Sequence, residues 1–355
     1  MSSLTKTNYN EETAWNIVTG ISSADTSTAT EGHREWRKLV RPAGRDGLGP
    51  WRQHHLRRKV LLSVWRVQDR LSLCLHRIQL LFVGQSGGLA LRELGKFKQL
   101  TYEDSVTGKT MQYNLLVPDG YDGTKEYPLV LFMADASTVG KDVTTPLTQG
   151  YGALEFASDR DQQRHLSFVL VPQYTEWTVK DDWGTSDEVE MTIQLLQTIC
   201  KEYKVDTNRL YTTGQSMGGM MSFYFNITHS DLFAASLFVS SQWDTTKIKD
   251  YGKKRFFYIV AGGDKKASGG MSDLTKVLKD NGARIDSASW SAKLPQEDQE
   301  RLAEELISKG GNINFIKWEA GSVLPESGKG MEHMASFDFA YKLAAVRDWL
   351  FKQTK

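Results

Sequence analysis

The chain has 355 residues, of which 40% are hydrophobic, 25% charged and 11% aromatic, a composition typical of a folded globular protein and not of a disordered one. Its formal net charge of +1 argues against nucleic-acid binding by the whole chain, and it has no apolar run as long as a membrane span needs. Two cysteines, Cys74 and Cys200, exclude a disulfide scaffold and a zinc site made of four cysteines.

The first 95 residues differ in charge from the rest of the chain. They carry 11 Arg and 3 Lys against 8 acidic residues, whereas residues 96–355 carry 7 Arg and 23 Lys against 35. A basic arm for nucleic acid or an anionic surface is one interpretation, but such arms usually lack the Trp and Leu residues found here. We expect residues 1–95 to be an irregular or weakly folded N-terminal segment and residues 96–355 to be one domain. No secretory signal pattern is readable at the N-terminus, so the sequence does not assign a compartment.

Strands are predicted at the start of this domain. Two of them, 99–105 and 111–118, flank a turn at Gly108. The apolar runs 127–133 and 167–171 are typical of strands buried on both faces. We therefore expect the domain to begin with four strands.

A long helix is expected next. Thr185 to Glu188 form a T-x-x-E capping box, in which the two side chains satisfy free backbone N–H groups at a helix start. Cys200 falls on the apolar face of this helix. Because the sequence shows no partner that would activate its thiol, we expect a core residue and not a reactive one.

The second half of the domain alternates strands with helices. This alternation predicts an α/β fold, a mostly parallel sheet with helices on both faces. Residues 287–310 form a polar insertion with a helical stretch, and insertions between late strands often cover a ligand crevice. We expect Trp290 in this insertion to point toward the crevice. The strands are predicted at residues 209–213, 233–240, 255–261 and 313–319, and the helices from residue 217, over 271–281 and over 337–351.

Residues 214–219, GQSMGG, match the pattern G-x-S-x-G. The pattern alone is weak, but a β-rich run leads into it and a helix-compatible run follows. A sharp strand-to-helix turn strains the serine backbone, needs small residues two positions away on either side, and exposes the hydroxyl above the carboxyl edge of the sheet. Ser216 is therefore the candidate nucleophile.

A serine nucleophile needs a base within hydrogen-bond reach. Of the seven histidines, the first four lie in the N-terminal segment. His165 precedes a strand at the opposite edge of the sheet, and His229 lies several turns down the helix that follows Ser216. His333 lies between the last strand and the last helix, at the carboxyl edge, and is the candidate base.

An acidic residue should orient this histidine, in the chain order Ser, Asp or Glu, His. Asp264 follows the strand 255–261 through two glycines, which puts its carboxylate at the crevice. Asp244, after the preceding strand, is the rival. We expect Asp264 to be the acid.

Acyl transfer also needs two backbone N–H donors for the oxyanion. One should come from Met217, immediately after the nucleophile. The other should come from the loop after the strand 127–133, at Ala134 or Asp135.

The segments YNLLVPDGYDGTKEYPLVLF, VPQY and DTNRLYTTGQSMGG resemble the α/β-hydrolase esterases related to polyhydroxybutyrate depolymerases and feruloyl esterases, a group that includes predicted peptidases. The resemblance covers about residues 99–355. It implies the α/β-hydrolase fold and a Ser-Asp-His hydrolase, which carries onto Ser216, Asp264 and His333. The group commonly has His-Gly where this chain has Ala134-Asp135, and its members are often secreted.

These features predict a serine esterase that cleaves a carboxylic ester through an acyl-enzyme. The alternatives are a peptidase of the prolyl oligopeptidase kind and a catalytically silent binding protein that keeps the fold. No metal or organic cofactor is expected, since the sequence has no H-E-x-x-H, no Cys/His cluster and no phosphate-binding glycine loop.

The expected partner is a small-molecule or polysaccharide-linked ester and not nucleic acid, and the sequence does not predict an oligomeric state. Trp243, Trp290 and Gln215 are expected to line the substrate pocket. Aromatic residues near strand ends are nevertheless more often packing residues.

Overall fold

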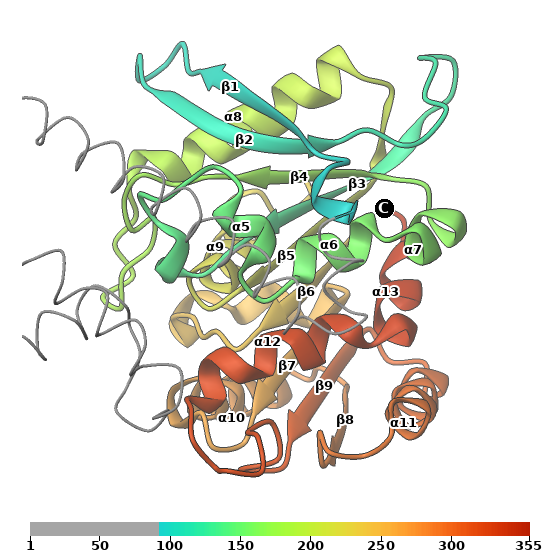
Figure 1. Ribbon diagram of the computed structural model, residues 1–355. Coiled ribbons are helices and arrows are strands. Elements are labelled where there is room, and N and C mark those ends of the chain that lie inside the picture. The colour runs from blue at the N-terminus through green and yellow to red at the C-terminus, as the bar shows by residue number, and fades with distance from the viewer. Residues whose placement is uncertain (1–91) are drawn as a thin grey trace, which may run out of the picture. The chain divides into compact units, whose positions relative to one another are not determined.

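The computed structural model describes residues 92–355, so nearly all of the predicted N-terminal segment lies outside the described residues. The described part forms a nine-stranded sheet with the order β1-β2-β4-β3-β5-β6-β7-β9-β8 (Figure 1). β2 pairs antiparallel with β1 and with β4, and all other pairs are parallel. The strands are β1 (Lys98–Glu103), β2 (Thr110–Leu116), β3 (Tyr127–Met133), β4 (Phe168–Pro172), β5 (Val205–Gln215), β6 (Ala235–Val239), β7 (Phe256–Ala261), β8 (Ile285–Trp290) and β9 (Ile313–Trp318).

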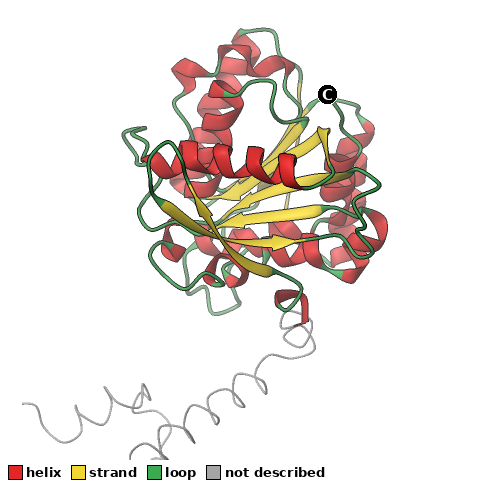
Figure 2. Ribbon diagram, turned by 90° about the horizontal axis from the view of Figure 1, so that it is seen from above, coloured by secondary structure: helices red, strands yellow, loops and turns green. Residues whose placement is uncertain are grey.

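Helices cover both faces of the sheet (Figure 2). One face packs against α8, α9 and α10, and the other packs against α6, α11, α12 and α13. The central strands β4, β6 and β7 are buried along their whole length, because their continuous apolar runs serve two cores at once. The helices are α5 (Thr145–Thr148), α6 (Gly152–Ala157), α7 (Asp159–Arg164), α8 (Asp187–Glu202), α9 (Met217–Thr228), α10 (Lys265–Asp280), α11 (Gln296–Ser308), α12 (Glu332–Lys342) and α13 (Ala344–Phe351). The predicted α/β class is confirmed.

The start of α8 differs from the expected capping box. Its N-cap is Ser186, one residue later than expected, and no side chain caps it. The Glu188 carboxylate instead accepts hydrogen bonds from the Thr175 backbone N–H and hydroxyl, at 3.0 and 2.7 Å. Glu188 is buried, so it fastens the loop after β4 to α8. The expected core position of Cys200 is borne out, since this residue packs against the core and burial raises the pKa of its thiol to about 11.

Other helix boundaries also differ from the sequence-based expectation. α10 begins at Lys265, six residues before the predicted start, because Asp264 caps its first turn. Gly269 and Gly270, which follow that turn, have a low helix propensity and hid the start of the helix in the sequence.

The predicted helix 337–351 is two helices, divided at the buried, extended Leu343. The first of them begins at Glu332, five residues earlier than expected, so His333 lies in the first turn of α12 and not in a loop. The Glu300 carboxylate accepts the Ala344 and Ala345 N–H groups, both at 2.9 Å, and so satisfies free donors at the start of the second helix.

The predicted polar insertion is a regular part of the fold. β8 pairs in parallel with β9 at the edge of the sheet, and α11 packs on it. Trp290 ends β8 with 4% of its surface exposed, and its ring packs edge-on against Trp318 at a centroid distance of 5.4 Å. The expectation of a loosely attached cover with Trp290 pointing toward a crevice is therefore wrong. The segment is polar because an edge strand and its helix each bury only one side.

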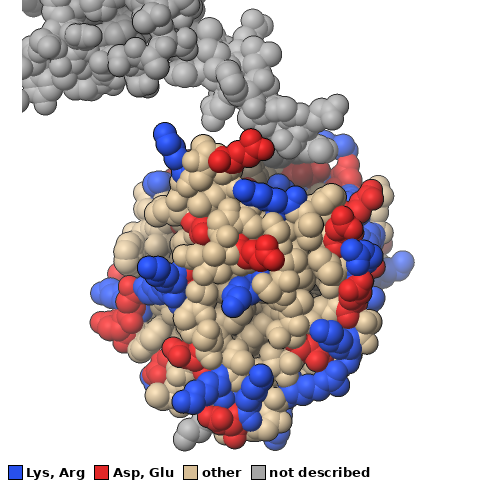
Figure 3. Space-filling model, turned by 90° about the horizontal axis from the view of Figure 1, so that it is seen from below, with Lys and Arg blue, Asp and Glu red and all other residues tan. Residues whose placement is uncertain are grey.

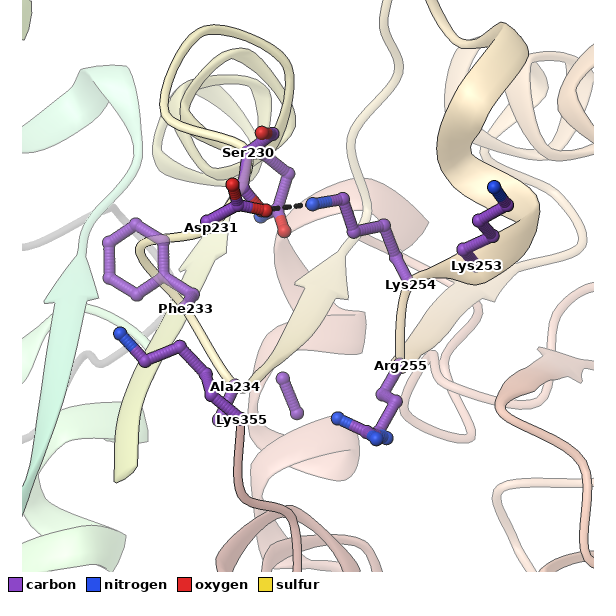
Figure 4. Close-up of a pocket in the computed structure, with 10 residues that line it drawn as sticks. Ser230, Asp231, Phe233, Ala234, Lys253, Lys254, Arg255 and Lys355 are labelled. Carbon is purple, nitrogen blue, oxygen red and sulfur yellow. Dashed lines mark hydrogen bonds between the residues drawn. The ribbon is translucent and has the colours of Figure 1, made fainter. Parts of the chain in front are cut away.

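The surface of the described part carries both signs of charge. Figure 3 shows one face on which basic and acidic side chains are interspersed. A hollow of about 350 Å³ lies at the amino ends of β6 and β7 (Figure 4), and its lining includes Asp231, Lys253, Arg255 and Lys355. Within residues 92–355, no helix has the length and apolarity that a membrane crossing requires.

Candidate active site

Ser216 occupies the turn between β5 and α9 with φ 52° and ψ −117°, a left-handed conformation that is strained for a residue with a side chain. Close packing explains why glycines surround it. A Cβ at Gly214 would overlap the Gly218 carbonyl group, and a Cβ at Gly218 would overlap the Met133 carbonyl oxygen. The turn presents the Ser216 hydroxyl at the carboxyl edge of the sheet, as the motif predicts.

The structure brings the three predicted triad side chains together. His333 Nε2 lies 2.8 Å from Ser216 Oγ, and His333 Nδ1 lies 2.6 Å from Asp264 Oδ2. With the imidazole proton on Nδ1, the ring donates to the carboxylate and accepts the serine proton. The Asp264 side chain is 6% exposed and the His333 side chain 32%, so the acid is shielded from water while the base stays accessible.

Asp264 has a second role in the same position. Its Oδ1 accepts a hydrogen bond from the Ala267 N–H at 3.2 Å and so caps α10. The helix cap and the histidine contact use different oxygens. Capping therefore fixes the carboxylate in the orientation that His333 requires.

The rival residues are engaged elsewhere. Asp244 Oδ1 accepts hydrogen bonds from the Thr246 N–H and hydroxyl, at 3.0 and 2.7 Å, within its own turn. His165 Nε2 lies 2.8 Å from Asp348, and His229 Nε2 lies 3.0 Å from Glu190 at the far end of α9. The four N-terminal histidines lie outside the described residues.

The candidate oxyanion donors lie beside the nucleophile. Met217 is the first residue of α9, so its N–H has no acceptor within the helix. The space that a Cβ at Gly218 would need is filled by the Met133 and Ala134 carbonyl groups, which brings the loop after β3 against the start of α9. The Asp135 carboxylate accepts the Ser137 N–H at 2.9 Å and is thereby held within its own loop. The choice between the Ala134 and Asp135 N–H groups stays a prediction.

Residues 105–305, more than half of the chain, match the model of a protein family described as "Putative esterase". The chain belongs to this esterase family. Ser216 and Asp264 lie within the matched residues, and His333 follows them. No curated protein matches the chain.

A solved structure of a thermostable esterase shares the fold of this esterase-family chain, which is the α/β-hydrolase fold. This thermostable esterase has 23% identity and a TM-score of 0.59, with 74% of this chain and 64% of that chain covered; the chain thus spans about two thirds of that esterase. A ferulic acid esterase has 14% identity and a TM-score of 0.48, covering 71% and 99%. S-formylglutathione hydrolase from Staphylococcus aureus has 14% identity and a TM-score of 0.43, covering 72% and 98%.

The predicted pocket residues are buried. Gln215 Nε2 donates to the Gln149 carbonyl at 2.7 Å and braces the loop that precedes α6. Trp243 packs against Trp183 at a centroid distance of 5.4 Å, and Trp290 belongs to the core at the sheet edge. A role of Gln215 and Trp243 in substrate binding stays a prediction.

Two further groups support His333, the candidate base, and were not found from the sequence. Ser336 Oγ donates to the His333 carbonyl at 2.8 Å and lies 2.5 Å from Ser240 Oγ. Ser240 has φ 41°, a strained conformation directly after β6. Its place at the carboxyl end of a buried strand is the signal that could have singled it out.

A tyrosine lies beneath the acid. The Tyr258 hydroxyl donates to the Ser241 carbonyl and also lies 3.2 Å from the Ala267 carbonyl oxygen, which joins the loop after β6 to the start of α10. Burial raises the pKa of Tyr258 far above its ordinary value, and the Asp264 charge adds to this effect. Tyr258 therefore stays a neutral donor. Among residues 92–355, no three His, Cys, Asp or Glu side chains are arranged to hold a metal ion.

Proposed function

We propose that this protein is a serine esterase that hydrolyses carboxylic esters through an acyl-enzyme. The observation that carries the proposal is the continuous hydrogen-bonded relay from Ser216 Oγ through His333 to Asp264, at 2.8 and 2.6 Å. Its position at a strained strand-to-helix turn, which exposes the serine hydroxyl, is the arrangement that nucleophilic acyl transfer needs. Membership of the esterase family supports the same class of reaction.

In this mechanism His333 Nε2 takes the Ser216 proton while Oγ attacks the ester carbonyl carbon. The oxyanion that forms is stabilised by the Met217 N–H and by a second N–H from Ala134 or Asp135. His333 then gives the proton to the leaving alcohol. Water repeats the sequence on the acyl-enzyme and releases the acid, and Asp264 keeps the imidazole in the required tautomer throughout.

The nucleophile and base are tested by Ser216→Ala and His333→Ala. Each variant is expected to lower p-nitrophenyl ester hydrolysis by about 10³-fold or more, because the two residues act as a unit. A fluorophosphonate probe should label the wild-type protein on Ser216 and leave Ser216→Ala unlabelled.

Ser230→Ala is the matched control. Ser230 is exposed near the far end of α9, so this variant should keep full activity and labelling. Substantial hydrolysis by Ser216→Ala, in protein free of contaminating esterase, would contradict the mechanism. A panel of p-nitrophenyl, feruloyl and acetyl-sugar esters, with a prolyl peptide as the peptidase arm, would then assign the acyl group.

A further inference from the structure

One carboxylate bridges the loops that carry the acid and the base. Glu332 Oε2 accepts a hydrogen bond from the Gly263 N–H at 2.8 Å, and Oε1 accepts one from the Gly321 N–H at 2.8 Å. Gly263 lies directly before Asp264, and Gly321 lies in the connection after β9. A single side chain therefore ties the loop after β7 to the connection between β9 and α12.

The approach at Gly263 is close. A Cβ at this position would overlap the Glu332 carboxylate, so a side chain here would displace the carboxylate from its contact with the backbone. Gly263 does not have a positive φ, and backbone strain gives no separate reason for it. The small size of Gly263 thus leaves the space that the Glu332 carboxylate occupies.

The hydrogen bond between Glu332 and Gly263 joins the two residues that directly precede His333 and Asp264 in the chain. Glu332 precedes His333 at the start of α12, and its bonded partner Gly263 precedes Asp264. Bonds from backbone N–H groups to a carboxylate are charge-assisted and stronger than neutral ones. They hold the backbones of Asp264 and His333 at a set separation, across which the 2.6 Å contact forms.

We propose that Glu332 is a positioning residue that aligns Asp264 with His333. The proposal rests on the proposed function and deepens it. The two oxygens of Glu332 accept hydrogen bonds from Gly263 and Gly321, whereas the contact with Ser216 Oγ is made by His333. Glu332 therefore acts through the acid and base and is not itself a catalytic residue. Without it the relay is expected to lose alignment while the ester site keeps its shape.

The first test measures kcat, KM and the thermal midpoint for Glu332→Ala and Glu332→Gln. A misplacement of about 1 Å can lower a rate by about 10²-fold, so we expect kcat of Glu332→Ala to fall by about 10- to 100-fold. KM should change by less than about 2-fold, because the lost contact serves the chemical step. Glu332→Gln keeps one acceptor and should fall in between, which provides a readout if the alanine variant does not fold.

The matched control is Glu326→Ala. Glu326 is an exposed glutamate of the same connection, so removing its charge changes the local net charge equally without touching the bridge. It should leave kcat and KM unchanged. A kcat within about 2-fold of wild type in Glu332→Ala, with a lowered thermal midpoint, would overturn the proposal and make Glu332 a structural tie only.

The second test is a double-mutant cycle with Asp264→Ala. If Glu332 acts through the acid, Glu332→Ala should lower kcat by less than about 2-fold in the Asp264→Ala background. An equal loss in both backgrounds would overturn the proposal.

A spectroscopic arm separates this inference from the proposed function. The downfield proton resonance of the His333–Asp264 hydrogen bond should shift or broaden in Glu332→Gln and persist in Glu326→Ala. An unchanged resonance in Glu332→Gln would contradict the positioning role. Absence of fluorophosphonate labelling in wild-type protein would instead contradict the proposed function, and the resonance would still report on Glu332.

Discussion

The turn at Ser216 and the β8–α11 unit are held in place by different kinds of contact. Around Ser216 the contacts are between backbone groups, so close that Gly214 and Gly218 have no space for a Cβ. The β8–α11 unit pairs with β9 through its strand and also depends on side-chain packing, with Trp290 edge-on against Trp318 of β9. We therefore expect the turn to be destabilised by substitutions that add side-chain atoms, and the β8–α11 unit to be destabilised by substitutions that remove them.

The largest effect is expected from the acid that faces the turn. Asp264→Asn should lower activity by about 10⁴-fold, because an amide no longer holds the imidazole in the required tautomer. Asp244→Asn should leave activity nearly unchanged, since Asp244 accepts hydrogen bonds within its own turn. Initial rates with one ester measure both, and the reverse ranking would move the acid to the loop after β6.

The next largest effect is expected in the β8–α11 unit at the edge of the sheet. Trp290→Ala should lower the free energy of unfolding by about 3–5 kcal/mol, as removal of a buried Trp side chain does. The ratio of rates for bulky and small esters should stay the same, because Trp290 packs in the core. Chemical denaturation measures the first quantity and an ester panel the second.

Trp177→Ala is the control for this substitution. Trp177 is 57% exposed, so its removal should change the free energy of unfolding by less than about 0.5 kcal/mol. A change in ester preference by Trp290→Ala without loss of stability would return Trp290 to the substrate pocket.

The smallest expected effect is the change in stability when a glycine is replaced by alanine, which adds a single methyl group. Gly218→Ala should destabilise the fold by about 1–3 kcal/mol or more, because the added methyl meets backbone atoms that cannot move independently. Gly269→Ala, inside α10 with nothing within 4 Å of its Cβ position, should instead stabilise the fold by about 0.5–1 kcal/mol. Thermal unfolding of the two variants measures the difference. Equal effects would show that close packing does not shape the turn.

Much of the fold was predictable from the sequence, because the buried strands and the strand-to-helix turn at Ser216 have strong local signals. The apolar run at β3 (Tyr127–Met133) coincides with the observed strand. The geometric grouping of Ser216 and His333 could be anticipated, since both follow strands whose carboxyl ends share one edge of the sheet.

The errors have physical causes at particular residues. β8 reads as polar because its side chains alternate in exposure at a sheet edge, and composition cannot distinguish such a strand from a solvated insertion. Glu188 accepts a hydrogen bond from Thr175 in the loop after β4, and Glu332 accepts one from Gly263 in the loop after β7. Local sequence patterns do not predict these partners. Long-range polar contacts of this kind need the fold itself.

The position of β9 has a consequence for how the protein is made. β9 is the last strand in the chain, yet it lies between β7 and β8, and β8 has no other strand partner in the described residues. Until β9 is synthesised, the edge of β7 stays unpaired and offers a template for pairing with another chain. His333 arrives later still, 117 residues after Ser216, so closing this long loop is among the slow steps of folding. Recovery of activity during refolding should therefore trail recovery of helical circular dichroism, and we expect the nascent chain to be inactive toward esters until α12, which follows the final strand, has docked.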